Sequence, residues 1–289
     1  MHTPTPDADE ASYLADLRAR QSASWPAGLP AELSYPLGER PLTEYLREWA
    51  RRDPGRTLLI FYGRRFSYAE VDQLSDRFAA FLLDQGITPG DRVAVMLPNC
   101  PQFMIAFYGI LKAGAVHVPV NPMFRSEELA YELRDSGARL MLAWDALVPM
   151  VEEVRGEVPL DLVVSTSLDH YLPGTPTLPV PSMAAATGAQ ADVSWDSALQ
   201  TALPWEWPDS DLDALAALNY TGGTTGMPKG CEHTQRNMVY TAACATSLRS
   251  SGAAEPGAAV SLVFIPVFWI AGEDGALIVP VFAGSPASC

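Results

Sequence analysis

The chain has 289 residues, of which 48% are hydrophobic and 18% charged, and its formal net charge is −15. A chain with this many apolar residues is globular rather than disordered, and it is long enough for a large core and one or two domains. The acidic excess argues against nonspecific binding to nucleic acid and against docking on an anionic membrane. We therefore expect no nucleic-acid partner, and a polyanionic ligand would need a local positive centre.

The four cysteines are Cys100, Cys231, Cys244 and Cys289. None of them forms a C-x-x-C pair, which argues against a disulfide scaffold and a zinc module. We expect no metal ligands, and the cysteine usage fits a reducing cytoplasm. The N-terminus shows no signal-peptide pattern. The most apolar run, residues 260–272, is too short to span a bilayer, and we interpret it as buried core. These features predict a cytoplasmic protein without an integral membrane segment.

Residues 1–40 are rich in proline, alanine and acidic residues, and they predict a loose tail with one short helix around residues 11–20. After this tail, helical spacing of apolar residues alternates with short apolar runs bounded by glycine or proline. The expected helices are 41–50, 67–85, 102–112 and 127–134, and the expected strands are 57–62, 92–97, 116–120, 140–143 and 162–164. The alternation predicts an α/β fold of mainly parallel sheets with flanking helices, and residues 41–170 form its first subdomain.

Residues 171–211 contain six prolines and few apolar runs. They predict a Pro-rich connection over the surface. Three tryptophans are expected to pin this connection to the body: Trp195, Trp205 and Trp207. Residues 212–289 then start a second subdomain, in which a strand ending at residue 221 leads into a loop and residues 231–234 return as the second strand of a hairpin. A helix is expected over residues 236–248.

The loop of this hairpin is the most informative stretch, and it reads Tyr220-Thr221-Gly222-Gly223-Thr224-Thr225-Gly226-Met227-Pro228-Lys229-Gly230. Its glycines let backbone N–H groups approach an anion, its threonines add hydroxyl donors, and its lysine adds a positive charge. It is neither a Walker A loop nor a dinucleotide fingerprint, because Lys229 follows Pro228 and the glycines have other spacings. A plain hairpin turn needs no such combination of threonines and lysine. The stretch predicts a phosphate-binding loop.

This loop resembles the phosphate loop of the adenylate-forming, or AMP-binding, enzymes, which include acyl- and aryl-CoA synthetases, luciferases and peptide-synthetase adenylation domains. Their usual form is Tyr-Thr-Ser-Gly-Thr-Thr-Gly-x-Pro-Lys-Gly. Gly222 stands at the serine position, a variant similar to the form of the fatty-acyl-CoA synthetases. The Leu97-Pro98-Asn99 segment and the later Ala-Gly-Ala and Val-Asn-Pro segments also resemble that family, where their role is largely structural. The resemblance implies that the ATP phosphates are bound by Thr221, Gly222, Gly223, Thr224, Thr225, Gly226 and Lys229.

A second segment, residues 266–272, is similar to the family pattern Pro-x-Phe-His-x-x-Gly, which lies near the nucleotide and the acyl group. The resemblance implies that Phe268, Trp269 and Gly272 line an acyl or nucleotide pocket. Trp269 stands at the histidine position and cannot titrate near neutral pH as imidazole does. An interpretation of Trp269 as a core aromatic residue is equally open. Gln235 stands where the family often has another histidine, so no role is carried over to it.

The resemblance implies a fold like the large N-terminal domain of these enzymes and an acid–thiol ligase activity with ATP, Mg²⁺ and CoA. A fatty acid and ATP would give an acyl-adenylate and pyrophosphate, and CoA would then take the acyl group. No catalytic residue is assigned, because the family's catalytic lysine belongs to a C-terminal domain that the sequence does not contain. The resemblance ends near residue 284, without the family's Tyr-Gly-x-Thr-Glu segment. We therefore expect the chain alone to lack full activity.

Three alternatives remain open from the sequence. The first is a non-catalytic truncated remnant or nucleotide-binding module that keeps the phosphate loop. The second and third are other adenylating enzymes, an aryl-CoA ligase or a peptide-synthetase adenylation domain. The residues also leave a homodimer open.

Overall fold

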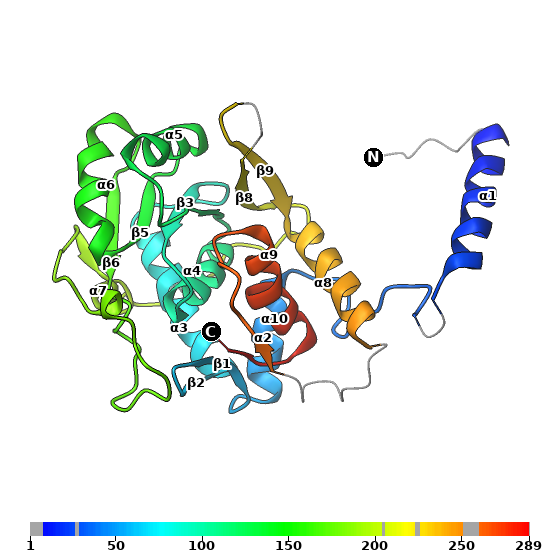
Figure 1. The fold of residues 1–289 in the computed structure, drawn as a ribbon, viewed down its shortest axis with the longest axis horizontal. Coiled ribbons are helices and arrows are strands. Elements are labelled where there is room, and N and C mark those ends of the chain that lie inside the picture. Colours follow the sequence, from blue (N-terminus) through cyan, green and yellow to red (C-terminus); the bar gives the residue numbers. More distant parts are fainter. Residues whose placement is uncertain (1–7, 27–28, 204–205, 223–225, 251–259, 289) are drawn as a thin grey trace.

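The computed structural model describes residues 8–26, 29–203, 206–222, 226–250 and 260–288. Two sheets and their helices form the body (Figure 1). The larger sheet has, in spatial order, β7 (Val193–Ser194), β6 (Leu162–Thr166), β5 (Leu140–Trp144), β3 (Arg92–Met96), β4 (Val116–Pro119), β8 (Leu215–Thr221) and β9 (Lys229–Thr234). All its neighbours are parallel except β8 and β9, which form an antiparallel hairpin. The predicted mainly parallel α/β fold is confirmed.

The smaller sheet is built from segments that are distant in sequence. Its strands are, in order, β10 (Ser261–Leu262), β11 (Ala287–Ser288), β1 (Thr57–Phe61) and β2 (Arg64–Ser67). β11 pairs parallel to both β10 and β1, and β1 pairs antiparallel to β2. The sheet therefore joins residues 57–67 to residues 261–262 and 287–288.

Helices cover both faces of the larger sheet. The α-helices of the described residues are α1 (Ala8–Ser24), which lies apart from the sheets, α2 (Leu42–Arg52), α3 (Tyr68–Asp84), α4 (Pro101–Lys112), α5 (Ser126–Ser136), α6 (Val148–Val154), α7 (Trp195–Ala198), α8 (Gln235–Ser250), α9 (Ile270–Glu273) and α10 (Val279–Ala283). Val93 and Val95 of β3 point into the core shared with α3 and α4, whereas Ala94 and Met96 point into the core under α5 and α6. Burial on both faces is what a parallel sheet requires, and it explains why β3 is apolar along nearly its whole length.

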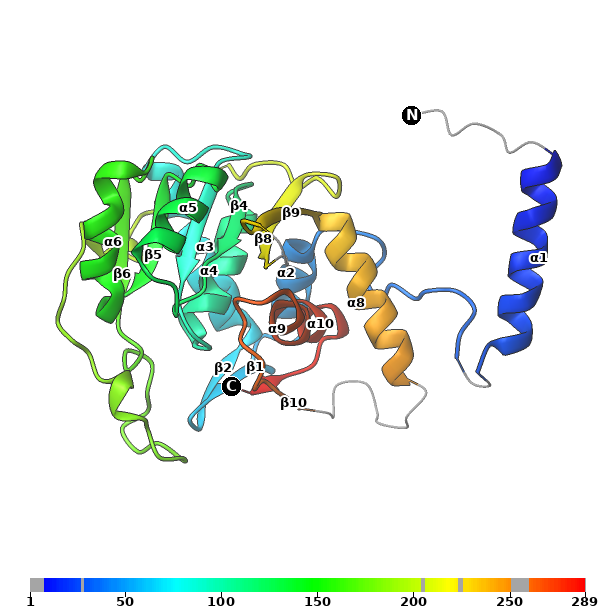
Figure 2. The same ribbon diagram turned by 45° about the horizontal axis from the view of Figure 1, so that its top comes forward.

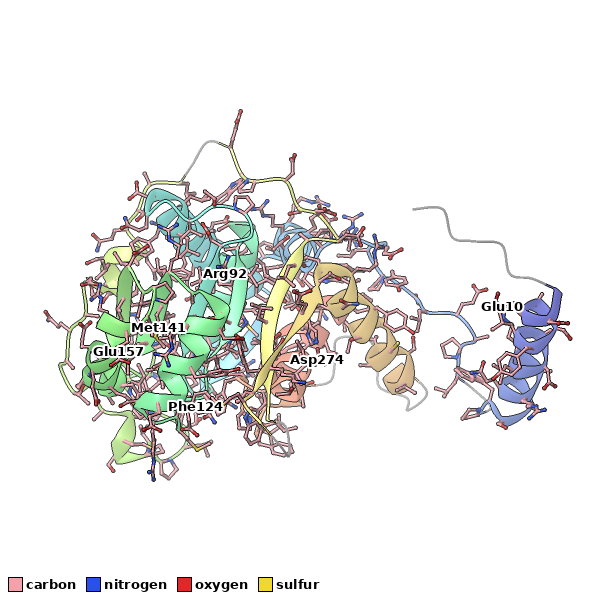
Figure 3. All side chains as sticks on the ribbon, turned by 90° about the horizontal axis from the view of Figure 1, so that it is seen from above. Glu10, Arg92, Phe124, Met141, Glu157 and Asp274 are labelled. Carbon is pink, nitrogen blue, oxygen red and sulfur yellow. The ribbon has the colours of Figure 1, made fainter. Side chains whose placement is uncertain are left out.

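The N-terminal tail forms a longer helix than expected. A helix was expected around residues 11–20, and α1 extends on both sides of that range. Figures 1, 2 and 3 all show α1, which carries Glu10, set apart from the two sheets. Its side chains from Asp9 onward are exposed. Within the described part of the chain, no helix is both long enough and apolar enough to cross a membrane.

The prediction that residues 260–272 form buried core is wrong. Four of their large side chains are at least half exposed: Val260 at 53%, Leu262 at 74%, Phe264 at 79% and Trp269 at 50%. The physical reason is topological, because β10 is the edge strand of the smaller sheet and the residues after it run over the surface. Val267 and Gly272 are the buried exceptions that fix this segment to the body.

The Pro-rich connection contains more regular structure than predicted. It contributes β7 to the larger sheet and the short helix α7. Trp195 is only 1% exposed, and its indole N–H donates to the Tyr171 hydroxyl at 3.0 Å. Trp207 packs partly buried, with the Arg47 guanidinium 5.3 Å from its ring centre. The expected anchoring is confirmed for these two tryptophans, and Trp205 lies outside the described residues.

Candidate phosphate-binding site

The loop joins the two strands of an edge hairpin. β8 and β9 pair from Leu215 with Thr234 to Thr221 with Lys229, so the predicted returning strand is confirmed. Figures 1 and 2 show the hairpin at one edge of the larger sheet, away from the smaller sheet. Four of the predicted loop residues are described and lie at its exposed end: Thr221, Gly222, Gly226 and Lys229. Gly223, Thr224 and Thr225 lie outside the described residues.

Lys229 is the positive centre of this loop. Its side chain is exposed, and it makes no ion pair within the described part of the chain. The sequence has only one other lysine, Lys112, whose side chain is fully buried between Asp72 and Asp76. In a chain of net charge −15, an exposed lysine without a carboxylate partner is available to an anionic ligand.

The backbone of the loop needs glycine. Gly226 has φ of 144°, a conformation that other residues adopt rarely. Across the hairpin, the Thr221 hydroxyl lies 3.5 Å from the Lys229 carbonyl oxygen and 3.9 Å from the Cys231 sulfur. At the base of a glycine-rich turn, a threonine hydroxyl and a lysine ammonium can both donate hydrogen bonds to phosphate oxygens.

The second predicted segment is a tight turn that leads into α9. The Trp269 N–H donates to the Pro266 carbonyl at 3.1 Å, and the Gly272 N–H donates to the Trp269 carbonyl at 2.9 Å. A Cβ atom at Gly272 would lie 2.0 Å from the Pro266 oxygen, so only glycine fits there. Trp269 packs edge-on against Phe268, at 5.7 Å between ring centres, with half of its surface exposed. This exposure excludes Trp269 from the core.

Asn99 holds this turn in place, although sequence reasoning assigned the Leu97-Pro98-Asn99 segment only a general structural role. Its amide donates to the Ile265 carbonyl at 3.0 Å, and its side-chain oxygen accepts from the Val267 N–H at 2.9 Å. Both polar atoms of one side chain are therefore used by the same distant segment. The only local signal is the break after β3, because the partner residues lie far away in sequence.

The two predicted segments are connected by buried polar side chains. Asn219, two residues before Thr221 on β8, donates from its amide to the Glu273 carboxylate on α9 at 3.3 Å. His117 Nδ1 on β4 lies 3.3 Å from the same carboxylate oxygen. Burial, and next to it the charge of Glu273, raises the pKa of the neighbouring Asp274 to about 6. The strand that enters the loop and the helix that follows the Trp269 turn are thus in direct contact.

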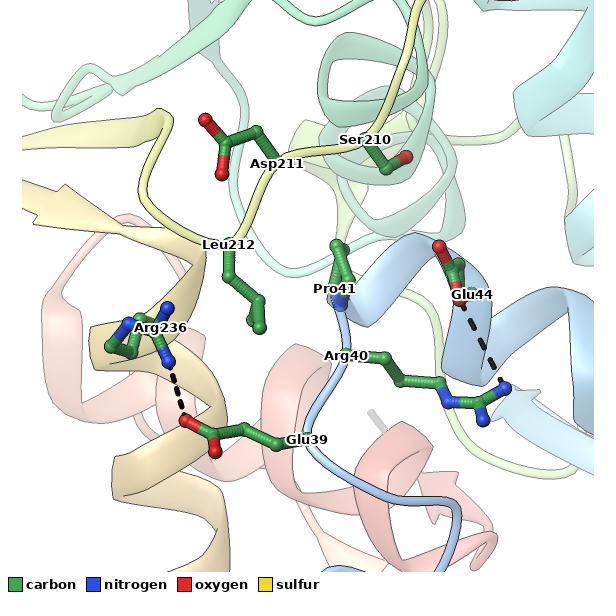
Figure 4. A pocket seen from close by; sticks show the side chains of 8 residues that line it. All are labelled: Glu39, Arg40, Pro41, Glu44, Ser210, Asp211, Leu212 and Arg236. Atoms are coloured by element: carbon green, nitrogen blue, oxygen red, sulfur yellow. Dashed lines mark hydrogen bonds and ion pairs between the residues drawn. The ribbon is translucent and has the colours of Figure 1, made fainter.

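A mostly polar cavity lies elsewhere in the described part of the chain. It has a volume of about 540 Å³ and is lined by residues 39–41, Glu44 of α2, residues 210–212 before β8 and Arg236 of α8 (Figure 4). Its arginines already have partners, since Arg236 pairs with Glu39 at 2.6 Å and Arg40 lies 3.9 Å from Glu44. None of the predicted loop or turn residues lines it.

The fold and the loop define a class of α/β protein that presents a glycine-rich loop on an edge hairpin. Within this class the family can be stated: residues 46–289 match the AMP-binding enzyme family, and the chain belongs to it. The match continues to residue 289, whereas the sequence resemblance was expected to end near residue 284. Those last residues include β11, whose two-residue length carries little local signal.

A long-chain-fatty-acid–CoA ligase of Bacillus subtilis (strain 168) is 33% identical over 264 residues, which cover 86% of this chain and 46% of that protein. A long-chain-fatty-acid-CoA ligase structure from Archaeoglobus fulgidus has a TM-score of 0.72 at 21% identity, covering 91% of this chain and 49% of that one. A benzoate CoA ligase structure from Burkholderia xenovorans LB400 has a TM-score of 0.68 at 23% identity, covering 86% and 45%. At these identities the two structures show a shared fold. The chain spans less than half the length of each of these proteins.

Proposed function

We propose that this chain forms the ATP-phosphate-binding part of an ATP-dependent fatty-acyl-CoA ligase. The observation that carries the proposal is the exposed Lys229 ammonium at the base of a glycine-rich hairpin loop, in a chain of net charge −15. Membership of the AMP-binding enzyme family and 33% identity to a fatty-acid–CoA ligase support it. Since the chain spans 46% of that relative, the activity of a whole ligase, with CoA as acceptor, belongs to the proposal.

The reaction needs positioning more than a protein nucleophile. A carboxylate oxygen of the acid attacks the α-phosphorus of ATP, and the bond to pyrophosphate breaks, which leaves an acyl-adenylate. The CoA thiol then attacks the acyl carbonyl, and AMP leaves. We assign the contacts to the β- and γ-phosphates to Thr221, Gly222, Gly223, Thr224, Thr225, Gly226 and Lys229. These groups would hold the departing pyrophosphate and stabilise its charge, which Mg²⁺ would share.

The proposed acid is a fatty acid, and Phe268 and Trp269 are proposed to wall its pocket, with Gly272 closing the turn. The half-exposed Trp269 and the exposed Phe264 support an apolar ligand, because they leave aromatic surface in contact with water. The fold shared with a benzoate CoA ligase gives no reason to prefer an aromatic acid. The exchange test described below therefore includes aryl and amino acids, which would be identified as substrates if they support exchange.

The two lysines of the chain allow a direct test of the loop. An amine-reactive acylating reagent should modify Lys229 and spare the buried Lys112, and MgATP or inorganic pyrophosphate should protect Lys229. Lys229→Ala should weaken MgATP binding by about tenfold or more, because a hydrogen bond to a charged group contributes about 1.5–3 kcal/mol. Arg65→Ala removes an exposed cation from the smaller sheet and serves as the matched control. Mass spectrometry and titration calorimetry measure the two effects.

The activity itself is tested by ATP–pyrophosphate exchange with fatty acids of several lengths, benzoate and amino acids, beside a full-length family member. Exchange that requires a fatty acid and Lys229 would establish adenylation by this chain. Exchange that requires benzoate or an amino acid would replace the proposed substrate. Binding of MgATP without exchange would leave a nucleotide-binding module, and unprotected labelling of Lys229 would refute the phosphate-binding assignment.

A further inference from the structure

The end of the β8–β9 hairpin has little support from the sheet. β8 pairs with β4 at one register position only, His117 with Ala217. β4 then ends at Pro119, which has no N–H to donate to a ladder. Beyond that position β8 continues to Thr221 with β9 as its strand partner, and β9 is itself the edge of the sheet. Beyond the hairpin pairing, lateral support for this end of β8 and β9 must come from contacts outside the sheet.

Helix α5 supplies contacts on both sides of the loop. The Tyr131 hydroxyl donates to the Pro228 carbonyl at 2.8 Å, and the Tyr220 hydroxyl donates to the Asp135 carboxylate at 2.6 Å. Tyr131 and Asp135 are four residues apart, so they lie on one face of α5. Tyr220 precedes the loop and Pro228 ends it. The two hydrogen bonds therefore bracket residues 221–227.

The contact to Pro228 acts directly on the lysine. The Pro228 carbonyl and the Lys229 nitrogen belong to one planar peptide group, so a fixed carbonyl also fixes the backbone of Lys229. On the other side, burial, and next to it the bond to Asp135, raises the pKa of the Tyr220 phenol. The phenol therefore stays protonated at neutral pH and keeps donating.

α5 is a firm base for these contacts. Its buried residues Leu129 and Leu133 pack in the core under α5 and α6, and Leu218 and Tyr220 of the hairpin pack against the same core. Figure 1 shows α5 beside the hairpin, at the edge of the sheet. A loop whose ends are held by a packed helix samples fewer conformations than a free loop. This matters for phosphate chemistry, because a shift of about 1 Å in a group that positions the phosphate is costly.

We propose that α5 holds the two ends of the phosphate loop, at Tyr220 and at Pro228–Lys229, with Tyr131, Asp135 and Tyr220 as positioning residues. This inference rests on the proposed function for its consequence, because a fixed Lys229 matters only if it binds phosphate. The fixing itself can be measured without any ligand.

The test compares Tyr131→Phe with Tyr45→Phe. Each substitution removes one tyrosine-to-carbonyl hydrogen bond of 2.8 Å, but the Tyr45 hydroxyl donates to Gly38, in a different part of the fold. Trypsin cleavage after Lys229, followed by mass spectrometry, should be faster in Tyr131→Phe than in the unmodified chain or in Tyr45→Phe. The affinity for MgATP and for pyrophosphate should fall about three- to tenfold in Tyr131→Phe and stay unchanged in Tyr45→Phe. Tyr220→Phe and Asp135→Asn should behave as Tyr131→Phe does.

The outcomes separate the two proposals. Faster cleavage in Tyr131→Phe without any binding of MgATP or pyrophosphate by the unmodified chain would keep the support by α5 and refute its role in phosphate binding. Lys229-dependent binding with equal cleavage and equal affinity in Tyr131→Phe and Tyr45→Phe would overturn this inference and leave the proposed function intact. A Tyr131→Phe variant that loses affinity only in proportion to its thermal stability would also overturn it.

Discussion

Asn99 connects two segments that are 166 to 168 residues apart in sequence. A side chain amide suits this position because it carries a donor and an acceptor, and the backbone around Ile265 and Val267 needs one of each. An aspartate would keep the acceptor for Val267 and lose the donor for Ile265. The position of the Trp269 turn, and of the proposed acyl pocket with it, therefore depends on a residue outside both predicted segments.

We expect Asn99→Ala to loosen the turn and to lower the free energy of unfolding by about 1–3 kcal/mol, the cost of leaving the part-buried Val267 N–H without a partner. Hydrogen exchange at the Val267 amide, followed by mass spectrometry, measures the local effect. Asn121→Ala is the matched control, because the Asn121 side-chain oxygen accepts only an exposed local bond from Met123. Unchanged exchange at Val267 in Asn99→Ala would contradict the role given to this side chain.

At the scale of elements, the sequence predicted most of the long helices from the helical spacing of their apolar residues. It predicted the central strands from short apolar runs bounded by glycine or proline. The two-residue strands β7, β10 and β11 were not predicted, since two residues have no periodicity and all three strands pair with distant segments. The loop residues could be proposed as phosphate ligands because they are adjacent in the sequence. Tyr131, Asn99 and Glu273 could not, because only the folded chain brings them to the loop and the turn.

α5 also carries a buried carboxylate that the sequence did not single out. Glu132 is 2% exposed, and burial, with the charge of Asp135 next, raises its pKa to about 8. Asp135 on the same helix and the Tyr220 phenol on β8 are the titratable groups that face it. The folded chain therefore keeps a proton on Glu132 between about pH 4.5 and about pH 8, whereas the unfolded chain has lost it.

The folded state binds one proton more than the unfolded state in this interval, so stability falls as pH rises from about 4.5 to about 8 and then stays low. Glu132→Gln should remove this loss: it should unfold at higher urea concentration than the unmodified chain at pH 9 and at a similar concentration at pH 5. Glu127→Gln, on the exposed face of the same helix, should follow the unmodified chain at both values. A stability difference between Glu132→Gln and the unmodified chain that does not change with pH would refute the raised pKa.

At the scale of the whole molecule, one core runs through both sheets and the C-terminal helices. It includes Leu58 of β1, Val93 of β3, Met238 of α8 and Phe282 of α10. The division into subdomains 41–170 and 212–289 stays a prediction, and this core crosses it. A polar cluster inside this core therefore contacts elements from both parts of the chain.

One buried polar cluster joins three elements of the body: His117 of β4, Asn219 of β8 and Glu273 of α9. Each side chain is 4% exposed or less. Phe103 and Phe107 of α4 place their ring centres 5.3 and 5.2 Å from the imidazole, so the surroundings are apolar. A buried polar side chain in such surroundings depends on its partners, and removing one of them is costly because the other is left buried without that contact. Removing both leaves Asn219 as the polar member of this site.

We therefore expect His117→Val to lower the free energy of unfolding by about 1–3 kcal/mol, the cost of leaving a buried polar group without a partner, and Glu273→Leu to lower it as well. The double variant should lose at least about 1 kcal/mol less than the sum of the single losses, because neither of the two side chains is then left without the other. Urea unfolding measured by circular dichroism gives all four values, and His117→Val combined with the distant Arg65→Ala should be additive within about 0.5 kcal/mol. Additive losses for His117→Val and Glu273→Leu would show that the two side chains do not stabilise each other. The contact between the strand entering the loop and the helix after the Trp269 turn would then rest on Asn219 and on apolar packing alone.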